Sequence, residues 1–137
     1  MTRSTFRSLV AATLLAGGLL CLLPASAFAG NDPSIQGRTR TGVNYAMQAF
    51  IQDRWDDERF MTHYDPVAGK LLRLRLMKLH DGIVKKGDFF VSCADFEDPK
   101  GRKYDLDFLV LPKGDLFQVN QASVHAAEGK KRKYHVE

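Results

Sequence analysis

The chain has 137 residues, a formal net charge of +4 and 45% hydrophobic residues. This length predicts one globular domain that is large enough to bury a core without cross-links. The basic excess lies at the two ends, since residues 30–127 carry equal numbers of acidic and basic side chains. Nucleic-acid binding would need a basic face spread over the fold, so we predict no nucleic-acid partner.

Residues 1–29 have the pattern of a cleaved secretory signal peptide. Arg3 and Arg7 precede an apolar stretch from Leu9 to Leu23, and residues 27–29 form a small-x-small cleavage signal. We therefore expect the mature chain to begin at Gly30 and to be exported to the periplasm or the cell exterior.

Cleavage would leave Cys93 as the one cysteine of the mature chain, because Cys21 lies in the signal segment. No intramolecular disulfide is then expected, although an oxidising compartment would permit Cys93 to pair with another molecule.

One helix is predicted near the start of the mature chain. Residues 30–42 are polar and rich in glycine, which predicts a flexible leader. From Val43 the apolar residues recur at helical spacing, and charged residues interrupt the stripe at Asp56, so the helix should end near residue 57.

Five or six antiparallel strands should follow the helix. Short alternating segments are separated by turn signals, of which the main ones are residues 65–69, Asp81-Gly82, residues 98–101 and residues 112–115. Residues 43–127 would form a single α+β domain, a helix packed on a curved antiparallel sheet, followed by a basic tail or edge strand at 128–137. In architecture alone this resembles cystatin-like and NTF2-like folds, and a shared architecture does not carry function.

The register of the hairpin around residues 98–101 follows from the cost of burying charge. Pairing Glu97 with Lys103 sets Asp95 opposite Asp105 and Cys93 opposite Asp107, with the alternate residues forming an apolar face. A shift by one residue would bury both aspartates of the second strand, so we predict the first register.

The hairpin before it predicts a β-bulge. A two-residue turn at Asp81-Gly82 would otherwise direct Arg73 and Arg75 into the core, and Gly87 is the residue best suited to absorb one extra position. Both arginines should then share the outer face with the acidic residues.

That outer face is the main candidate site. Its predicted polar cluster consists of Arg73, Arg75, Cys93, Asp95, Asp105 and Asp107. The cluster is either a ladder of cross-strand ion pairs or a site in which close carboxylates share a proton or hold a cation. His80 and His125 are predicted to end strands beside turns, and the alternative is a metal or proton-transfer role. Neither belongs to a metal-ligand spacing, so no metal ligand and no cofactor is assigned.

Two further surfaces are candidates for binding. A pocket between helix and sheet would be lined by Phe50, Trp55, Phe90 and Tyr104, although the same residues would also fill a core. Lys130, Lys131, Arg132 and Lys133 would contact an anionic surface such as a lipid headgroup or a polyanion, or would simply be solvated.

We expect a noncatalytic exported domain that recognises a protein or a small apolar ligand. The chain lacks the glycine-rich, nucleophile and haem motifs that identify common enzyme classes. Two alternatives stay open: a small hydrolase or isomerase using the helix-sheet pocket, and a structural subunit that forms a homo-oligomer through its sheet edge and tail.

Overall fold

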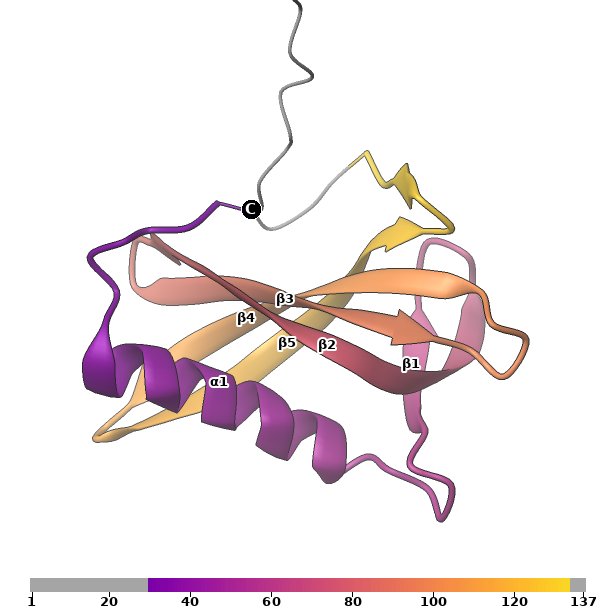
Figure 1. Cartoon of the computed structure of the whole chain (residues 1–137), viewed down its shortest axis with the longest axis horizontal. Coiled ribbons are helices and arrows are strands. Elements are labelled where there is room, and N and C mark those ends of the chain that lie inside the picture. The colour runs from indigo at the N-terminus through magenta and orange to yellow at the C-terminus, as the bar shows by residue number, and fades with distance from the viewer. Residues whose placement is uncertain (1–29, 134–137) are drawn as a thin grey trace, which may run out of the picture.

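A computed structural model describes residues 30–133, and the predicted signal peptide and residues 134–137 lie outside this range. Helix α1 (Gly37–Gln52) is followed by six strands, which are β1 (Met61–Asp65), β2 (Lys70–Lys86), β3 (Phe89–Glu97), β4 (Lys103–Lys113), β5 (Leu116–Ala127) and β6 (Lys130–Lys131). The strands form one antiparallel sheet in the order of the sequence, and α1 lies across one face of it (Figure 1). The predicted α+β architecture is therefore confirmed.

Helix α1 begins six residues before the predicted start at Val43, and Ile35 just ahead of it is buried. The apolar stripe does not account for these first turns. The side chain of Arg40 holds them instead, because its guanidinium donates hydrogen bonds to the carbonyl oxygens of Ile35 and Asp81.

The helix ends at Gln52 rather than near residue 57. The carboxylate of Asp56 accepts hydrogen bonds from the backbone N–H groups of Glu58 and Phe60, at 2.9 and 3.0 Å. These bonds fold residues 56–60 into a turn, and a local side-chain acceptor of this kind competes with further helix.

The core lies between α1 and the sheet. Val43, Ala46, Met47 and Ile51 are the buried residues of the helix. They join the alternate sheet residues Leu72, Leu74, Phe90, Ala94, Phe96, Tyr104, Leu106, Phe108 and Val110 in one hydrophobic cluster. Strand alternation therefore places the intervening residues of β3 and β4 on the opposite face.

The β3–β4 register matches the prediction at every position, including Glu97 with Lys103, Asp95 with Asp105 and Cys93 with Asp107. The β2–β3 turn was predicted wrongly. Strand β2 runs through Asp81-Gly82, and the chain reverses at Gly87 and Asp88, between the paired residues Lys86 and Phe89. Gly87 has φ +57°, the left-handed conformation that such a turn requires and that glycine adopts without strain.

The predicted bulge at Gly87 is also wrong, because the register shifts earlier in β2. One shift lies between Leu76 and Lys78 and another between Leu79 and Ile83. In the second, three residues of β2 (His80, Asp81 and Gly82) stand opposite the single residue Cys93 of β3. The irregularity therefore lies directly beside the predicted polar cluster.

The sheet curves enough to bring its two ends together. Arg132, just after β6, donates a 2.7 Å hydrogen bond to the carboxylate of Asp65 at the end of β1. Asp65 is fully buried, and its carboxylate also accepts hydrogen bonds from the backbone N–H groups of Val67 and Ala68. This ion pair joins the first strand to the last.

Candidate functional site

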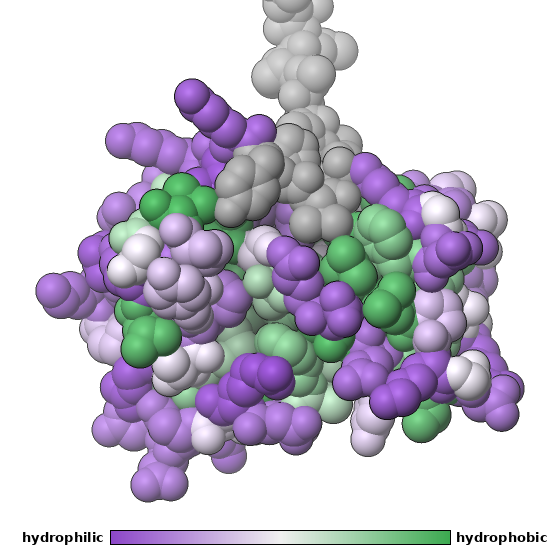
Figure 2. Space-filling view, turned by 180° about the vertical axis from the view of Figure 1, so that it is seen from behind, coloured by the Kyte–Doolittle hydropathy of each residue, from purple (hydrophilic) through white to green (hydrophobic). Residues whose placement is uncertain are grey.

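The sheet face turned away from α1 carries a compact group of polar side chains. Cys93 and Asp95 project from β3 and Asp105 and Asp107 from β4, in two directly opposed pairs. Cys93 and Asp107 are 2% and 1% exposed, whereas Asp95 and Asp105 are partly exposed. Figure 2 shows this side of the molecule, where hydrophobic residues reach the surface among hydrophilic ones.

His80 enters this group from the irregularity in β2. Its Nδ1 lies 2.9 Å from Sγ of Cys93, and its Nε2 lies 3.0 Å from Oδ2 of Asp95. Both ring nitrogens therefore have partners, which fixes the orientation of the imidazole. Bulges commonly serve to redirect a side chain next to a site, and here the bulge brings His80 to the polar group.

Contacts on both sides hold the bulge in place. The hydroxyl of Ser92 donates a 2.8 Å hydrogen bond to the carbonyl oxygen of Gly82. On the N-terminal side, the backbone N–H of Asp32 donates to the carbonyl oxygen of Ile83 at 2.8 Å, and Arg40 donates to the carbonyl oxygen of Asp81. Asp32 and the first turn of α1 thus position His80.

His125 enters from a second bulge. Asp105 pairs with Ala126 and Leu106 with Val124, so His125 is the extra residue between them in β5. Its Nδ1 lies 3.1 Å from Oδ2 of Asp107, and both side chains are buried. A buried carboxylate and imidazole that are hydrogen-bonded satisfy each other and fix each other's orientation.

Asp105 has the most unusual environment of these residues. Burial raises the pKa of its carboxyl group to about 6, the charges of Asp95 and Asp107 add to this effect, and His80 and His125 oppose it. Its Oδ1 is a buried atom with no hydrogen-bond partner among residues 30–133. An acceptor in this position favours a proton or a cation as its partner.

Three of these side chains are arranged to hold a metal ion. One donor atom each from His80, Cys93 and Asp105 lie within 4.8 Å of one another. Imidazole, thiolate and carboxylate together suit zinc and chemically similar divalent ions. Asp95, on the other nitrogen of His80, occupies the position of the carboxylate that typically orients a metal-binding histidine.

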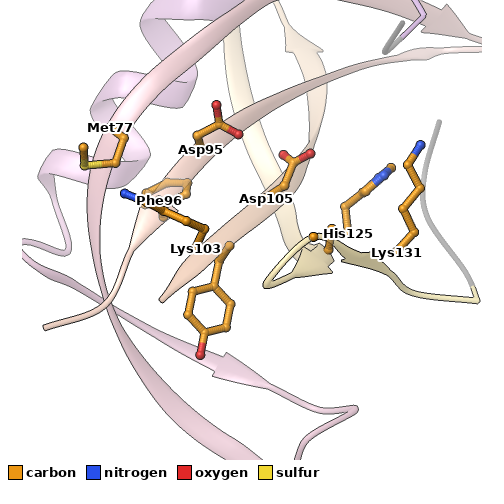
Figure 3. A pocket seen from close by; sticks show the side chains of 10 residues that line it. Met77, Asp95, Phe96, Lys103, Asp105, His125 and Lys131 are labelled. Carbon is orange, nitrogen blue, oxygen red and sulfur yellow. The ribbon is translucent and has the colours of Figure 1, made fainter. Parts of the chain in front are cut away.

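A pocket of about 480 Å³ adjoins this group (Figure 3). Its polar lining residues include Asp95, Asp105 and His125, with Lys103 and Lys131 from β4 and β6. Met77 and Ala126 give it accessible apolar walls, and Phe96 and Tyr104 border it from the core side. In Figure 3 the carboxylates of Asp95 and Asp105 point to the same side of the sheet, with Lys131 beside His125.

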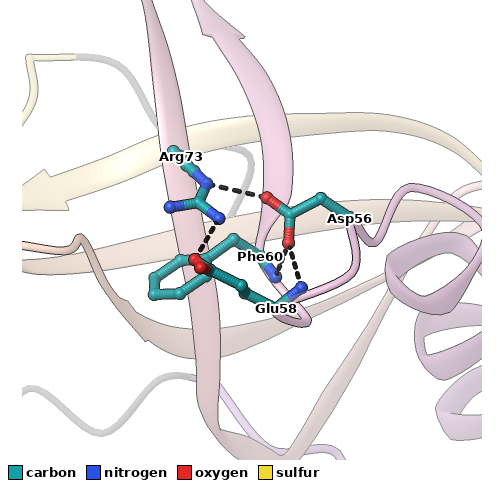
Figure 4. Close-up of polar contacts among 4 residues, drawn as sticks. All are labelled: Asp56, Glu58, Phe60 and Arg73. Carbon is teal, nitrogen blue, oxygen red and sulfur yellow. Dashed lines mark hydrogen bonds and ion pairs between the residues drawn. The ribbon is translucent and has the colours of Figure 1, made fainter.

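Arg73 and Arg75 have partners outside the polar group. Arg73 binds Asp56 at 2.7 Å and Glu58 at 2.6 Å, with its guanidinium 4.3 Å from the ring centre of Phe60 (Figure 4). Arg75 binds Glu97 at 2.5 Å. His80 rather than an arginine therefore contacts Asp95, so the predicted cluster contains the right acids with a different basic partner.

The aromatic residues predicted to line a helix-sheet pocket contribute to packing. Phe90 and Tyr104 belong to the core cluster, and Phe50 and Trp55 pack against it. The Phe50 ring meets the Phe108 ring edge-on at 5.9 Å. The filled-core alternative accounts for these contacts. The large pocket described above lies at the polar group instead.

The basic tail is divided between solvent and the fold. Lys130, Lys131 and Lys133 are exposed, and the first two form β6, within the predicted tail or edge strand at 128–137, of which residues 134–137 lie outside the described range. Arg132 is engaged by Asp65. A contact with an anionic surface would therefore use the three lysines and not Arg132.

His80 and His125 are the two site residues that were left out of the predicted cluster, since a metal or proton-transfer role was only the alternative for them. The Asp81-Gly82 pair suggested a turn immediately after His80, although Gly87-Asp88 offers an equally good turn signal. For His125, the sequence contains no signal for the bulge that redirects it.

No protein-family model matches the chain, and neither a curated protein nor a solved structure shows significant similarity to it. Within residues 30–133, α1 is too short and too polar to cross a membrane.

Proposed function

We propose that the protein is an exported domain that binds a divalent transition-metal ion through His80, Cys93 and Asp105. The observation that carries this proposal is the convergence of three different donor types within 4.8 Å. It retains the noncatalytic binding role expected from the sequence. The ligand, however, becomes an ion on the outer sheet face instead of an apolar molecule under the helix.

The surroundings of the three donors support this assignment. With Nε2–H of His80 donating to Asp95, Nδ1 carries the lone pair that a metal needs, and it lies beside the Cys93 sulfur. The buried Oδ1 of Asp105 gains the partner that it lacks among the described residues. Zinc sites with three protein ligands of this kind are common.

Cobalt titration of the mature protein tests the proposal. A thiolate-to-Co²⁺ charge-transfer band should appear at one equivalent, and Zn²⁺ should displace it. Cys93→Ser should abolish the band, and His80→Gln and Asp105→Asn should weaken Co²⁺ binding by at least about tenfold. Asp88→Asn, in the exposed β2–β3 turn, is the matched control and should bind normally. Absence of the band in the folded wild-type protein would refute the proposal.

A thiol nucleophile is a second candidate. Cys93, His80 and Asp95 follow one another in the order of nucleophile, base and orienting acid that activated thiols use. We place it second because Cys93 is only 2% exposed. Alkylation by iodoacetamide in a chelating buffer separates the two: an activated thiol reacts faster than free cysteine at pH 6 and loses this advantage in His80→Gln.

Export is also proposed, on the pattern of residues 1–29. Protein isolated from its native compartment should have an intact mass that begins at Gly30. A mass that includes Met1 would contradict export by signal cleavage.

A further inference from the structure

The metal centre would have room for a ligand from outside the protein. Among residues 30–133 the group offers three donor atoms, whereas zinc-like ions take four or five ligands when a site is open. Asp105 is at once one of these donors and part of the pocket wall, and Asp95 beside it lines the pocket as well. An ion held there lies at the edge of a cavity large enough for a small organic molecule.

The charges around the pocket differ from one side to the other. Asp95 and Asp105 form the side that adjoins the metal-binding donors. On the other side, Lys131 is exposed and its ammonium makes no ion pair within the described part of the chain, whereas Lys103 is held by Glu97 at 2.6 Å. Lys131 is thus the cation of the pocket that is available to a ligand carboxylate.

Between these two sides the accessible wall is apolar. Met77, which is 50% exposed, and the partly exposed Ala126 contribute aliphatic surface, whereas the side chains of Phe96 and Tyr104 lie in the core behind this wall. A ligand that matches the whole pocket has a metal-coordinating group, a carboxylate and an apolar portion.

We propose that this pocket binds a free α-amino acid with an apolar side chain, an inference that rests on the metal-binding function proposed above. The amine nitrogen and one carboxylate oxygen chelate the metal, and the amine releases its proton to solvent on coordination. The carboxylate faces Lys131, and the side chain packs on Met77 and Ala126. Together with His80, Cys93 and Asp105, the two ligand atoms give five-coordination, which open zinc sites adopt.

Three small molecules test the inference on the Co²⁺-loaded protein. L-leucine carries both groups, 4-methylpentanoate lacks the amine, and isopentylamine lacks the carboxylate. Each is titrated while the visible d–d bands and the thiolate-to-Co²⁺ band are recorded. Leucine should shift the d–d bands, keep the thiolate band, and bind at least about tenfold more tightly than either fragment, because one molecule makes both contacts.

Variants of the two neighbouring lysines identify the carboxylate contact. Lys131→Met should weaken leucine and 4-methylpentanoate several-fold and leave isopentylamine and Co²⁺ affinity unchanged. Lys130→Met, one residue away on β6, is the matched control and should change none of these affinities.

Two outcomes with the Co²⁺-loaded protein overturn the inference while the metal-binding proposal stands. In the first, leucine binds no more tightly than its fragments. In the second, leucine removes Co²⁺ and abolishes the thiolate band. Failure of Co²⁺ itself to bind overturns both proposals, so the two failures are distinguishable.

Discussion

At the scale of single residues, Asp105 carries the largest conflict between folding and function. Its pKa is raised to about 6 in the folded protein, mainly by burial, against an ordinary value of 3.8. Below pH 3.8 the carboxyl is mostly protonated in both states, and between pH 3.8 and about 6 it is mostly ionised in the unfolded state but mostly protonated in the folded state. The ionisation therefore destabilises the metal-free fold progressively as pH rises through this window.

Asp105→Asn should consequently stabilise the metal-free protein above pH 6, by on the order of 1 kcal/mol after allowance for the solvent contact of a partly exposed group. Below pH 4 the two proteins should unfold alike. Urea denaturation at pH 3.5 and pH 7.5 in the presence of a chelator measures the difference. A variant that is less stable at both pH values would show that Asp105 has another stabilising role.

At the scale of elements, two β-bulges bring the histidines to the site. The bulge at His80–Gly82 depends on Arg40, whose guanidinium donates to the carbonyl oxygen of Asp81 and also bonds the side chain of Asn31 at 3.3 Å. The first turn of α1 is therefore linked through these hydrogen bonds to His80, the proposed metal ligand on the far face of the sheet.

Arg40→Met should weaken Co²⁺ binding by about tenfold, at the lower end of the effect of residues that position metal ligands. Circular dichroism should show a loss of helix no larger than the first turns of α1, which Arg40 holds. Arg38→Met is the matched control, because Arg38 lies on the same helix and forms an ion pair with Asp115 in which both side chains are largely exposed. Equal losses in the two variants would mean that the bulge does not depend on Arg40.

The sequence was most informative where burial alone decides the structure. Strand alternation and the cost of burying Asp105 and Asp107 were sufficient to predict the β3–β4 register residue by residue. The β2–β3 turn was not decided in this way, because Asp81-Gly82 and Gly87-Asp88 are both suitable turn pairs. Contacts from Arg40 and Asp32, distant in sequence, stabilise the first pair as a bulge.

The site was predicted only in part, because contacts between residues distant in sequence also decide which histidines reach it. Cys93, Asp95, Asp105 and Asp107 follow from alternation, whereas His80 and His125 reach the site through register shifts in β2 and β5. Such shifts depend on tertiary contacts, and no local residue pattern marks them. Arg73 had seemed available to the acids, but Asp56 and Glu58 lie closer after the helix ends at Gln52.

At the scale of the whole molecule, the Asp65–Arg132 ion pair joins the two ends of the sheet. Both side chains are largely buried, at 1% and 16% exposed. Arg132→Met would leave the Asp65 carboxylate buried with two backbone N–H donors, and should lower the free energy of unfolding by about 3 kcal/mol. Chemical denaturation measures this loss, and Lys133→Met, at an exposed neighbour, should cost little. A loss below about 0.5 kcal/mol would show that solvent replaces the contact.

The order of the strands has a consequence for how the chain folds. Each strand pairs with its neighbour in sequence, so the sheet can grow one hairpin at a time through contacts of short sequence separation, which favours rapid folding. His80, Cys93, Asp105 and His125 all lie on β2 to β5, within this continuous run of hairpins. The contact between Asp65 and Arg132 spans 67 residues and requires every intervening strand to be in place. The three proposed metal donors lie on β2 to β4, so once Arg40 and Asp32 support the bulge in β2 the donors can come together before Arg132 reaches Asp65.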